Sequence, residues 1–433
     1  MDLEKGDFQP SVTRPKTEVP APLPESFHPF SLAAYPDDFW ARLELRNCFK
    51  SVESLIKVEC IDVDSSQRTT AGKFSSLAEL QLYTSQSTTS NHGIRVISIC
   101  QANSWKPLNV TREMFRSIVG FTAVSPEFLD IALGFYQRDV AVEEAFSSAP
   151  LYKCNAESIG HITNDYAEVA YICKYAFFKP NEEGKDPWSL RQTGVYQKYD
   201  LKTKSATWIF LHPTNVSVFQ TRLNQILKST EGSRKIQEHP LLLHNILFSS
   251  VFPQWREYLA YYERKILSLS NTTMSEQIQE TLRVNHKTLT SVRFMENRCL
   301  PLRAILPAME KSLQSIRRAN DALLEAGILK SPAKEALSQL LDNYSSHLEA
   351  YIQNTSFLQS RAARTAELIA DTLTFKNSYS AQSQNDYMLK LTMSTVDDST
   401  TVRVITIVTL IYLPATFTAV RLPLPRKEES PSL

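Results

Sequence analysis

The chain has 433 residues, and its 47 lysines and arginines nearly balance its 46 aspartates and glutamates, which gives a formal net charge of +1. The basic residues are dispersed, with clusters no longer than pairs such as Arg317-Arg318, so the charge pattern argues against a nucleic-acid partner. Only 10 glycines are present, which favours long helices over a turn-rich β architecture. The 6 cysteines form no C-x-x-C pair, a pattern typical of free thiols in a reducing compartment.

Residues 1–25 are rich in proline and charge and contain no apolar core. A secretory signal peptide requires such a core, so we expect none here. The segment also lacks the large apolar groups that would offset the entropy cost of ordering it. It is therefore predicted to be a disordered tail.

Residues 26–235 alternate between helical and strand-like patterns, which predicts a mixed α/β soluble domain. Pro36-Asp37-Asp38 provides an acidic helix start before an apolar face. Two further helical stretches are expected within residues 111–138, separated by Ser125-Pro126, a cap followed by the preferred first helical residue. Period-two or apolar runs predict strands at residues 55–63, 93–101, 167–178, 194–199 and 206–211.

Residues 236–400 carry apolar side chains at helical spacing, which predicts a helical stalk and an α+β fold class for the whole chain. Pro301 and Pro307 are expected to kink or interrupt their helix. Gly327 should end one helix, and Ser331-Pro332 should begin the next. No proline or glycine follows before Pro414, so this helix could reach about 80 residues, or roughly 120 Å. The polar run at residues 377–382 is a candidate break.

Residues 401–420 contain an uncharged run from Val404 to Val420, before a polar, proline-rich tail at residues 421–433. As a helix, the run reaches about 26 Å, the short limit for crossing a bilayer core of roughly 30 Å. Residues 404–409 are β-branched at every position, so a buried strand is the alternative. A lone strand in lipid leaves its backbone groups unsatisfied, whereas a helix satisfies its own. We therefore expect a single C-terminal transmembrane-like helix, with the strand left open.

Two stretches carry a resemblance to a known family. Residues 402–417, VRVITIVTLIYLPATF, resemble the first transmembrane helix of CorA-type magnesium transporters, and residues 397–399 place acids before it, as in the relatives. The blocks DPWSLRQTGVYQKYD and SATWIFLHP resemble the soluble domain of a fungal CorA-like group. The residues that carry this second likeness are Trp188, Arg191, Gln192, Tyr196 and Trp208.

The resemblance implies a homopentamer in a membrane, with the N-terminal domain in the cytoplasm. Each subunit would contribute an α/β domain, a stalk helix, a pore-lining helix and a second membrane helix. The transported ion would be Mg²⁺ or another divalent cation, with no covalently bound cofactor. A Gly-Met-Asn signature forms the selectivity filter in the family, because amide carbonyls can recognise a hydrated Mg²⁺ ion without stripping its water.

One face of the predicted helix would line such a pore. Spacings of three and four bring its residues together, although the same stripe could instead pack helix against helix. Two acids just before it are candidates for a ring that concentrates divalent cations, with a solvated helix surface as the alternative. The pore-lining candidates are Val402, Ile405, Thr409, Leu413 and Thr416, and the candidate metal residues are Asp397 and Asp398.

The chain departs from the family pattern at its end. The signature positions fall on Pro423-Leu424-Pro425, and no second apolar segment follows. We therefore expect a truncated relative that does not transport alone but co-assembles with full-length CorA-like relatives; whether the truncation is real or a gene-model artefact stays open. The alternative is a regulatory module that binds a ligand or protein, either membrane-anchored or soluble in the cytoplasm.

An enzyme is not expected. The chain contains no G-x-G-x-x-G, G-x-x-x-x-G-K-[ST], H-E-x-x-H or G-x-S-x-G motif. His239 and His244 are five residues apart, which misses the i, i+4 spacing that places two metal ligands on one helix face.

Overall fold

The computed structural model describes residues 36–51, 56–87, 92–155, 166–179 and 186–421. The chain divides into two compact units: unit 1 comprises residues 1–261 and 299–358, and unit 2 comprises residues 262–298 and 359–433. The predicted tail at residues 1–25 lies outside the described residues, as does nearly all of the tail at 421–433.

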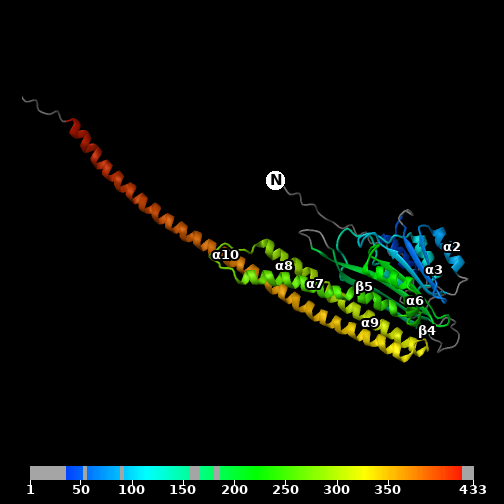
Figure 1. Cartoon of the computed structure of the whole chain (residues 1–433). Coiled ribbons are helices and arrows are strands. Elements are labelled where there is room, and N and C mark those ends of the chain that lie inside the picture. The colour runs from blue at the N-terminus through cyan, green and yellow to red at the C-terminus, as the bar shows by residue number, and fades with distance from the viewer. Residues whose placement is uncertain (1–35, 52–55, 88–91, 156–165, 180–185, 422–433) are drawn as a thin grey trace, which may run out of the picture. The chain divides into compact units, whose positions relative to one another are not determined.

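Unit 1 contains a seven-stranded sheet with the order β2-β1-β3-β7-β6-β5-β4 (Figure 1). Neighbouring strands are antiparallel except for β3 and β7, which are parallel. The central strands are buried on both faces, which explains their apolar sequences. The strands are β1 (Val58–Asp64), β2 (Thr69–Phe74), β3 (His92–Cys100), β4 (Leu151–Asn155), β5 (Tyr166–Phe178), β6 (Trp188–Asp200) and β7 (Ser205–His212).

Helices make up the rest of both units, and α7, α8 and α10 each contribute residues to both. They are α1 (Pro36–Leu45), α2 (Leu77–Ser87), α3 (Arg112–Phe121), α4 (Phe128–Ala132), α5 (Val218–Lys228), α6 (Thr230–Glu238), α7 (Leu242–Met274), α8 (His286–Cys299), α9 (Leu302–Glu325) and α10 (Ser331–Arg421). The predicted α/β pattern is confirmed: the five expected strands correspond to β1, β3, β5, β6 and β7.

Helices cover both faces of the sheet in unit 1. On one face, Phe115 of α3 contacts Trp40 of α1 and Phe128 of α4 in a large apolar core. On the other face, Phe219 of α5 packs edge-on against Phe210 of β7. Successive side chains of β7 point to opposite faces, so Phe210 packs on α5 while Ile209 and Leu211 join the apolar core on the other face.

Gly327 ends α9 as predicted. Its φ of +68° is the left-handed conformation that glycine adopts most easily. The N–H of Ile328 then donates to the carbonyl of Leu323, which closes the helix end. Beyond this turn, α10 begins at the predicted Ser331.

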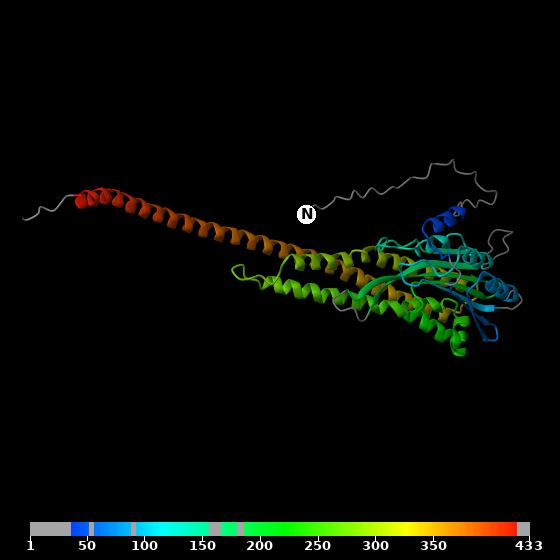
Figure 2. The same cartoon turned by 90° about the horizontal axis from the view of Figure 1, so that it is seen from above.

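Helices α9 and α10 run through segments where the sequence suggested breaks or a strand. Pro307 lies inside α9 and does not interrupt it, because the helix tolerates the one lost backbone donor within a tightly packed stretch. The polar run at residues 377–382 does not break α10, which is continuous over 91 residues. Residues 404–409 are helical, so the strand alternative is wrong. Figure 2 shows this C-terminal part of α10 as a single helix.

Among the residues that the structure describes, no helix has the length and apolar character needed to cross a membrane. The predicted transmembrane-like helix at residues 401–420 is therefore present as a helix but unsupported as a membrane span.

Candidate functional site

The predicted pore-lining residues lie in the last part of α10. Val402, Ile405 and Leu413 are each more than half exposed. They share one face with Thr409 and Thr416, since the spacings are three and four residues along one helix. The structure thus places the five candidates together on a surface that no other described part of the chain covers.

The two threonines on this face use their hydroxyl protons locally. Thr409 donates to the carbonyl of Ile405 at 2.6 Å, and Thr416 donates to the carbonyl of Tyr412 at 2.9 Å. A hydroxyl that donates back to its own helix keeps its lone pairs free as acceptors. Each hydroxyl oxygen can therefore accept a hydrogen bond from the water shell of a hydrated cation.

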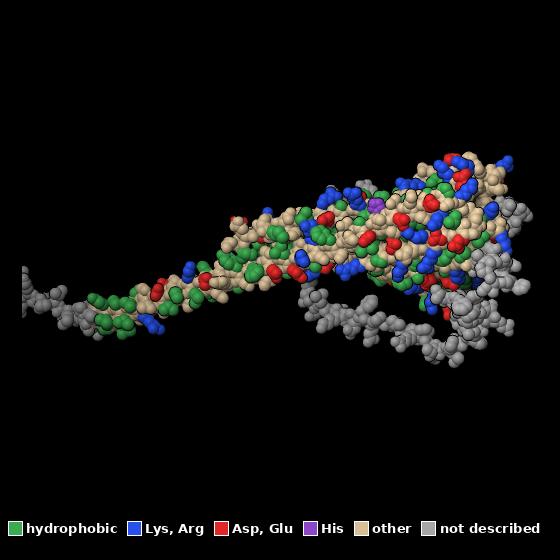
Figure 3. All heavy atoms as spheres, turned by 90° about the horizontal axis from the view of Figure 1, so that it is seen from below, with side chains coloured by type: hydrophobic (Ala, Val, Ile, Leu, Met, Phe, Trp, Pro, Cys, Tyr) green, Lys and Arg blue, Asp and Glu red, His purple; other side chains and the backbone are tan. Residues whose placement is uncertain are grey.

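The opposite face of this stretch is equally apolar. Val404, Ile407 and Ile411 are also more than half exposed, and Figure 3 shows hydrophobic side chains on the visible face of the described end of the helix. A helix that is apolar all round needs cover from other helices or from lipid. One chain by itself does not distinguish a pore face from a packing face.

Asp397 and Asp398 are both exposed on α10, but they do not share a face. Asp398 precedes Val402 by four residues and so lies on the face of the pore-lining candidates. Asp397 lies about 100° from Asp398 around the helix axis and so faces another side. Within the described residues, no group of three or more His, Cys, Asp or Glu side chains could hold a metal ion. The metal role of the two aspartates stays a prediction.

The histidine pair that the sequence disfavoured as a metal site has other roles. The two ring nitrogens of His244 are hydrogen-bonded to the Tyr171 hydroxyl at 2.9 Å and to Gln197 Oε1 at 2.8 Å. Burial lowers the pKa of His244 to about 3, so the ring is neutral at neutral pH. His239 bonds instead to the carbonyl of Ala333. Both residues therefore support packing in unit 1.

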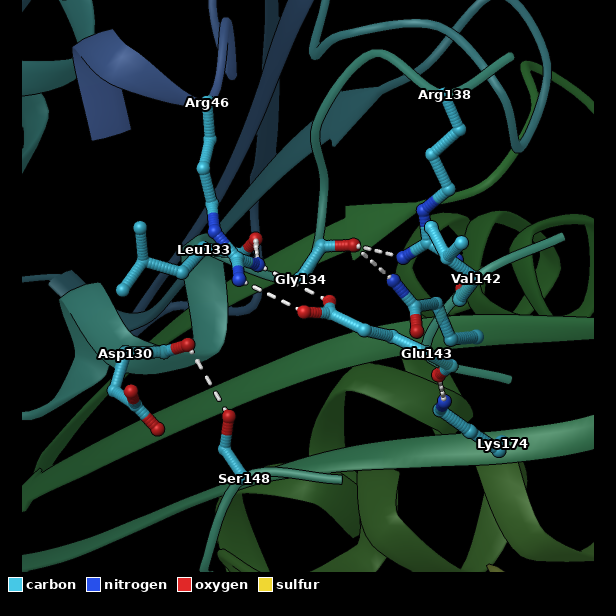
Figure 4. Close-up of polar contacts among 10 residues, drawn as sticks. Arg46, Asp130, Leu133, Gly134, Arg138, Val142, Glu143, Ser148 and Lys174 are labelled. Carbon is cyan, nitrogen blue, oxygen red and sulfur yellow. Dashed lines mark hydrogen bonds and ion pairs between the residues drawn. The ribbon is translucent and has the colours of Figure 1, made fainter. Parts of the chain in front are cut away.

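A polar network that the sequence did not suggest fixes the loop after α4. Arg46 makes a two-pronged ion pair with Glu143, with distances of 2.8 and 3.1 Å (Figure 4). Lys174 of β5 donates to the backbone carbonyls of Glu143 at 2.8 Å and Glu144 at 2.7 Å. Together they hold Glu143 at a φ of 57°, a left-handed conformation that costs a side-chain-bearing residue about 1 kcal/mol or more.

The electrostatics of this network follow from burial and pairing. Burial, followed by the nearby charge of Arg138, lowers the pKa of Lys174 to about 8. The hydrogen bond from Arg46 lowers the pKa of Glu143. Arg138 donates to the carbonyls of Gly134 and Val142. These contacts fix the backbone of the loop to the sheet. A lysine inside a mostly apolar strand is the sequence signal that could have revealed the network.

Comparisons with known proteins identify the family. A model of the family described as CorA-like transporters matches residues 35–274, more than half of the chain. The chain therefore belongs to the CorA-like transporters. No curated protein matches it.

Two solved structures are similar to the chain. One, described as the full-length CmaX protein, is 11% identical, with a TM-score of 0.45, and the match covers 87% of this chain and 89% of that one. The other is the ZntB cytoplasmic domain from Vibrio parahaemolyticus, which is 10% identical, with a TM-score of 0.39; this match covers 74% of this chain and 98% of that one.

Family membership confirms part of what the sequence predicted. The chain is a relative of divalent-cation transporters and not an enzyme. Divalent cations are the substrates of the family, whose members carry no covalent cofactor and form homo-oligomers.

Proposed function

We propose that this chain is a membrane-associated, homo-oligomeric relative of the divalent-cation transporters, with Mg²⁺ as its substrate. The N-terminal α/β domain would lie in the cytoplasm, and a family-like assembly would be a pentamer. The observation that carries the proposal is the CorA-like family match, which spans residues 35–274.

The end of α10 supports this proposal with its own chemistry. One face presents the Asp398 carboxylate and then the hydroxyl oxygens of Thr409 and Thr416, separated by aliphatic side chains. Carboxylate and hydroxyl oxygens are ligands that suit Mg²⁺ and its water shell. Copies of this face around a common axis would provide a ring of carboxylates and then a mostly apolar passage, which can close by dewetting.

The remaining faces of the helix support association with a membrane or with other helices. Val404, Ile407 and Ile411 are exposed to solvent in the single chain. Covering such side chains stabilises an assembly by about 25 cal/mol for each Å² of apolar surface removed from water.

Cation uptake by vesicles tests the proposal. The purified full chain is reconstituted together with a full-length CorA-like transporter into liposomes that contain a Mg²⁺-sensitive dye, and uptake is followed after Mg²⁺ is added outside. Because the chain is expected to act in co-assembly with such a relative and not alone, we expect the rate of uptake to differ from that of liposomes that hold the same amount of the full-length transporter without the chain. Identical rates, with the chain shown to be incorporated, would contradict the proposal.

Two neighbouring aspartates provide a matched pair of variants for the same assay. Asp398→Asn should slow Mg²⁺ uptake severalfold, because it removes the carboxylates that raise the local cation concentration on the proposed pore face. Asp397→Asn removes an equal charge from another face of the same helix and should have a much smaller effect. Equal effects of the two substitutions would show that Asp398 acts only through overall charge.

A further inference from the structure

A cavity of about 360 Å³ opens on the sheet of unit 1 and contains none of the proposed pore-lining residues. It lies over the strands β1, β2 and β3, beside the first turn of α5. Pockets of this size hold small organic ligands. Its polar lining consists of Lys57, Glu59, Lys73, Ser75, Cys100, Asn215 and Gln220.

Strand register explains how these polar groups meet. Glu59 of β1 pairs with Lys73 of β2 and with Ser98 of β3, so their side chains share one face of the sheet. Cys100 lies two residues beyond Ser98 and therefore on the same face. Gln220 approaches this face from α5, and its Nε2 donates to Cys100 Sγ at 3.4 Å.

The amide of Gln220 supplies an unmet hydrogen-bond acceptor beside the cavity. The residue is only 6% exposed, yet its Oε1 has no hydrogen-bond partner among the described residues. A buried amide oxygen without a donor is destabilising, so a ligand that supplies an N–H to this oxygen would be favoured. Burial raises the pKa of Cys100 to about 11, which keeps the neighbouring thiol protonated and unreactive at neutral pH.

Both positively and negatively charged side chains line the cavity. Glu59 and Lys73 form an ion pair at 2.9 Å, and the Lys73 side chain is 82% exposed. Lys57 makes no ion pair within the described part of the chain and is free to receive a carboxylate. A ligand that carries an ammonium, whose N–H can meet Gln220 Oε1, and a carboxylate for Lys57 matches this set, whereas a simple anion would leave the Gln220 oxygen without a donor.

We propose that this cavity binds a small zwitterion of the amino-acid class. Its ammonium donates to Gln220 Oε1 and lies near Glu59, and its carboxylate accepts from Lys57. The inference is independent of the proposed transport function, and its test requires no cation flux.

The first experiment is a thermal unfolding assay on the purified full chain. All 5 tryptophans (Trp40, Trp105, Trp188, Trp208 and Trp255) lie in unit 1, so their fluorescence reports the unit that contains the cavity. The probe is an equimolar mixture of the protein amino acids other than tryptophan and tyrosine, which would fluoresce themselves, compared with sodium chloride of equal conductivity; each amino acid is then added singly. Binding to the folded state should raise the unfolding temperature. No shift with the mixture would overturn the proposal.

Modified probes test the zwitterion itself. For the amino acid that gives the largest shift, the carboxyamide lacks the carboxylate and the N-acetyl derivative lacks the ammonium. Each should bind at least about tenfold more weakly than the parent, the loss expected for one charge-assisted hydrogen bond. A derivative that binds as tightly as the parent amino acid would overturn the contact proposed for the charged group that the derivative lacks.

Variants locate the site. Gln220→Leu should abolish the shift without unfolding unit 1, because its Oε1 has no partner to lose and its Nε2 loses only the weak hydrogen bond to Cys100 Sγ. Lys57→Gln, at an exposed position, should weaken binding about tenfold and keeps the test valid if Gln220→Leu does not fold. The control is Lys228→Gln, an exposed lysine at the other end of α5. If Lys57→Gln binds as well as wild type, or if the control loses as much affinity, the cavity is not the site.

Discussion

His212 at the end of β7 is fully buried between aromatic rings. Its ring lies 5.9 Å from that of Phe210 and 5.8 Å from that of Phe219. Burial lowers its pKa to about 3, because a charged imidazolium would lose its hydration there. The ring is therefore neutral in the folded protein at every pH at which most proteins are stable.

This buried histidine predicts a pH dependence of stability. Below pH 6.5 the unfolded chain takes up a proton at His212, whereas the folded chain does so only near pH 3. The free energy of unfolding of unit 1 should therefore fall with pH from about 6.5 downward, by up to about 1.4 kcal/mol per pH unit for this group. His212→Phe should reduce this slope, as measured by urea unfolding followed through tryptophan fluorescence between pH 6.5 and pH 5.

A matched control uses a histidine on the surface. His347 is exposed on α10, and His347→Phe should leave the slope as in wild type. If His212→Phe retains the full wild-type slope between pH 6.5 and pH 5, the buried neutral ring is not the cause.

Single residues also show where sequence reasoning reaches its limit. The Arg46–Glu143 ion pair joins residues 97 positions apart, and the carbonyl partners of Lys174 lie on a loop with no regular pattern. Gln220 likewise reads as an ordinary polar residue near a helix start. Only the tertiary fold brings such groups together, so local periodicity and spacing could not identify them.

At the scale of elements, Asn320 of α9 makes a buried polar contact with the start of α10. Its side chain is fully buried and donates to the carbonyl of Lys334 at 3.0 Å and to the Ser338 hydroxyl at 3.2 Å. Its Oδ1 has no partner within the described residues. The contact fixes the register of two helices, but it leaves one buried acceptor unsatisfied.

Two substitutions at this position should have opposite outcomes. Asn320→Leu removes the unsatisfied oxygen and should leave the free energy of unfolding of unit 1 unchanged or raise it by about 1 kcal/mol. Asn320→Asp places a charge there without a cation and should lower it by about 3 kcal/mol or more. Urea unfolding followed through tryptophan fluorescence measures both; a strongly destabilised Asn320→Leu would show that the contact itself matters more than its unmet oxygen.

The sequence predicted the elements with strong periodicity and missed those without it. The central strands carry long buried runs, and α10 contains no internal glycine, so both were found. Strand β2 has mostly exposed residues and includes Gly72, over which the Phe74 ring packs. Strand β4 has only five residues. Both are stabilised by pairing with a neighbour rather than by their own pattern.

In the whole molecule, the proposed function requires copies of α10 to meet around one axis. The face of Thr409 turns toward that axis in our proposal, and the face of Ile411 turns away from it. Both side chains belong to the same helix and are exposed in the single chain, so only an assembly can make them differ. Neither sequence periodicity nor one chain alone selects the inner face.

Disulfide cross-linking between copies shows which face of α10 turns toward the shared axis. Cys154 is the one cysteine of the six that is not buried, so the background carries Cys154→Ser. Thr409→Cys and Ile411→Cys are each introduced into the full chain, which is reconstituted in liposomes and oxidised. If Thr409 faces the shared axis, disulfide-linked dimers should form rapidly with Thr409→Cys and slowly with Ile411→Cys. Equal rates, or the reverse order, would show that the Thr409 face is not the inner one.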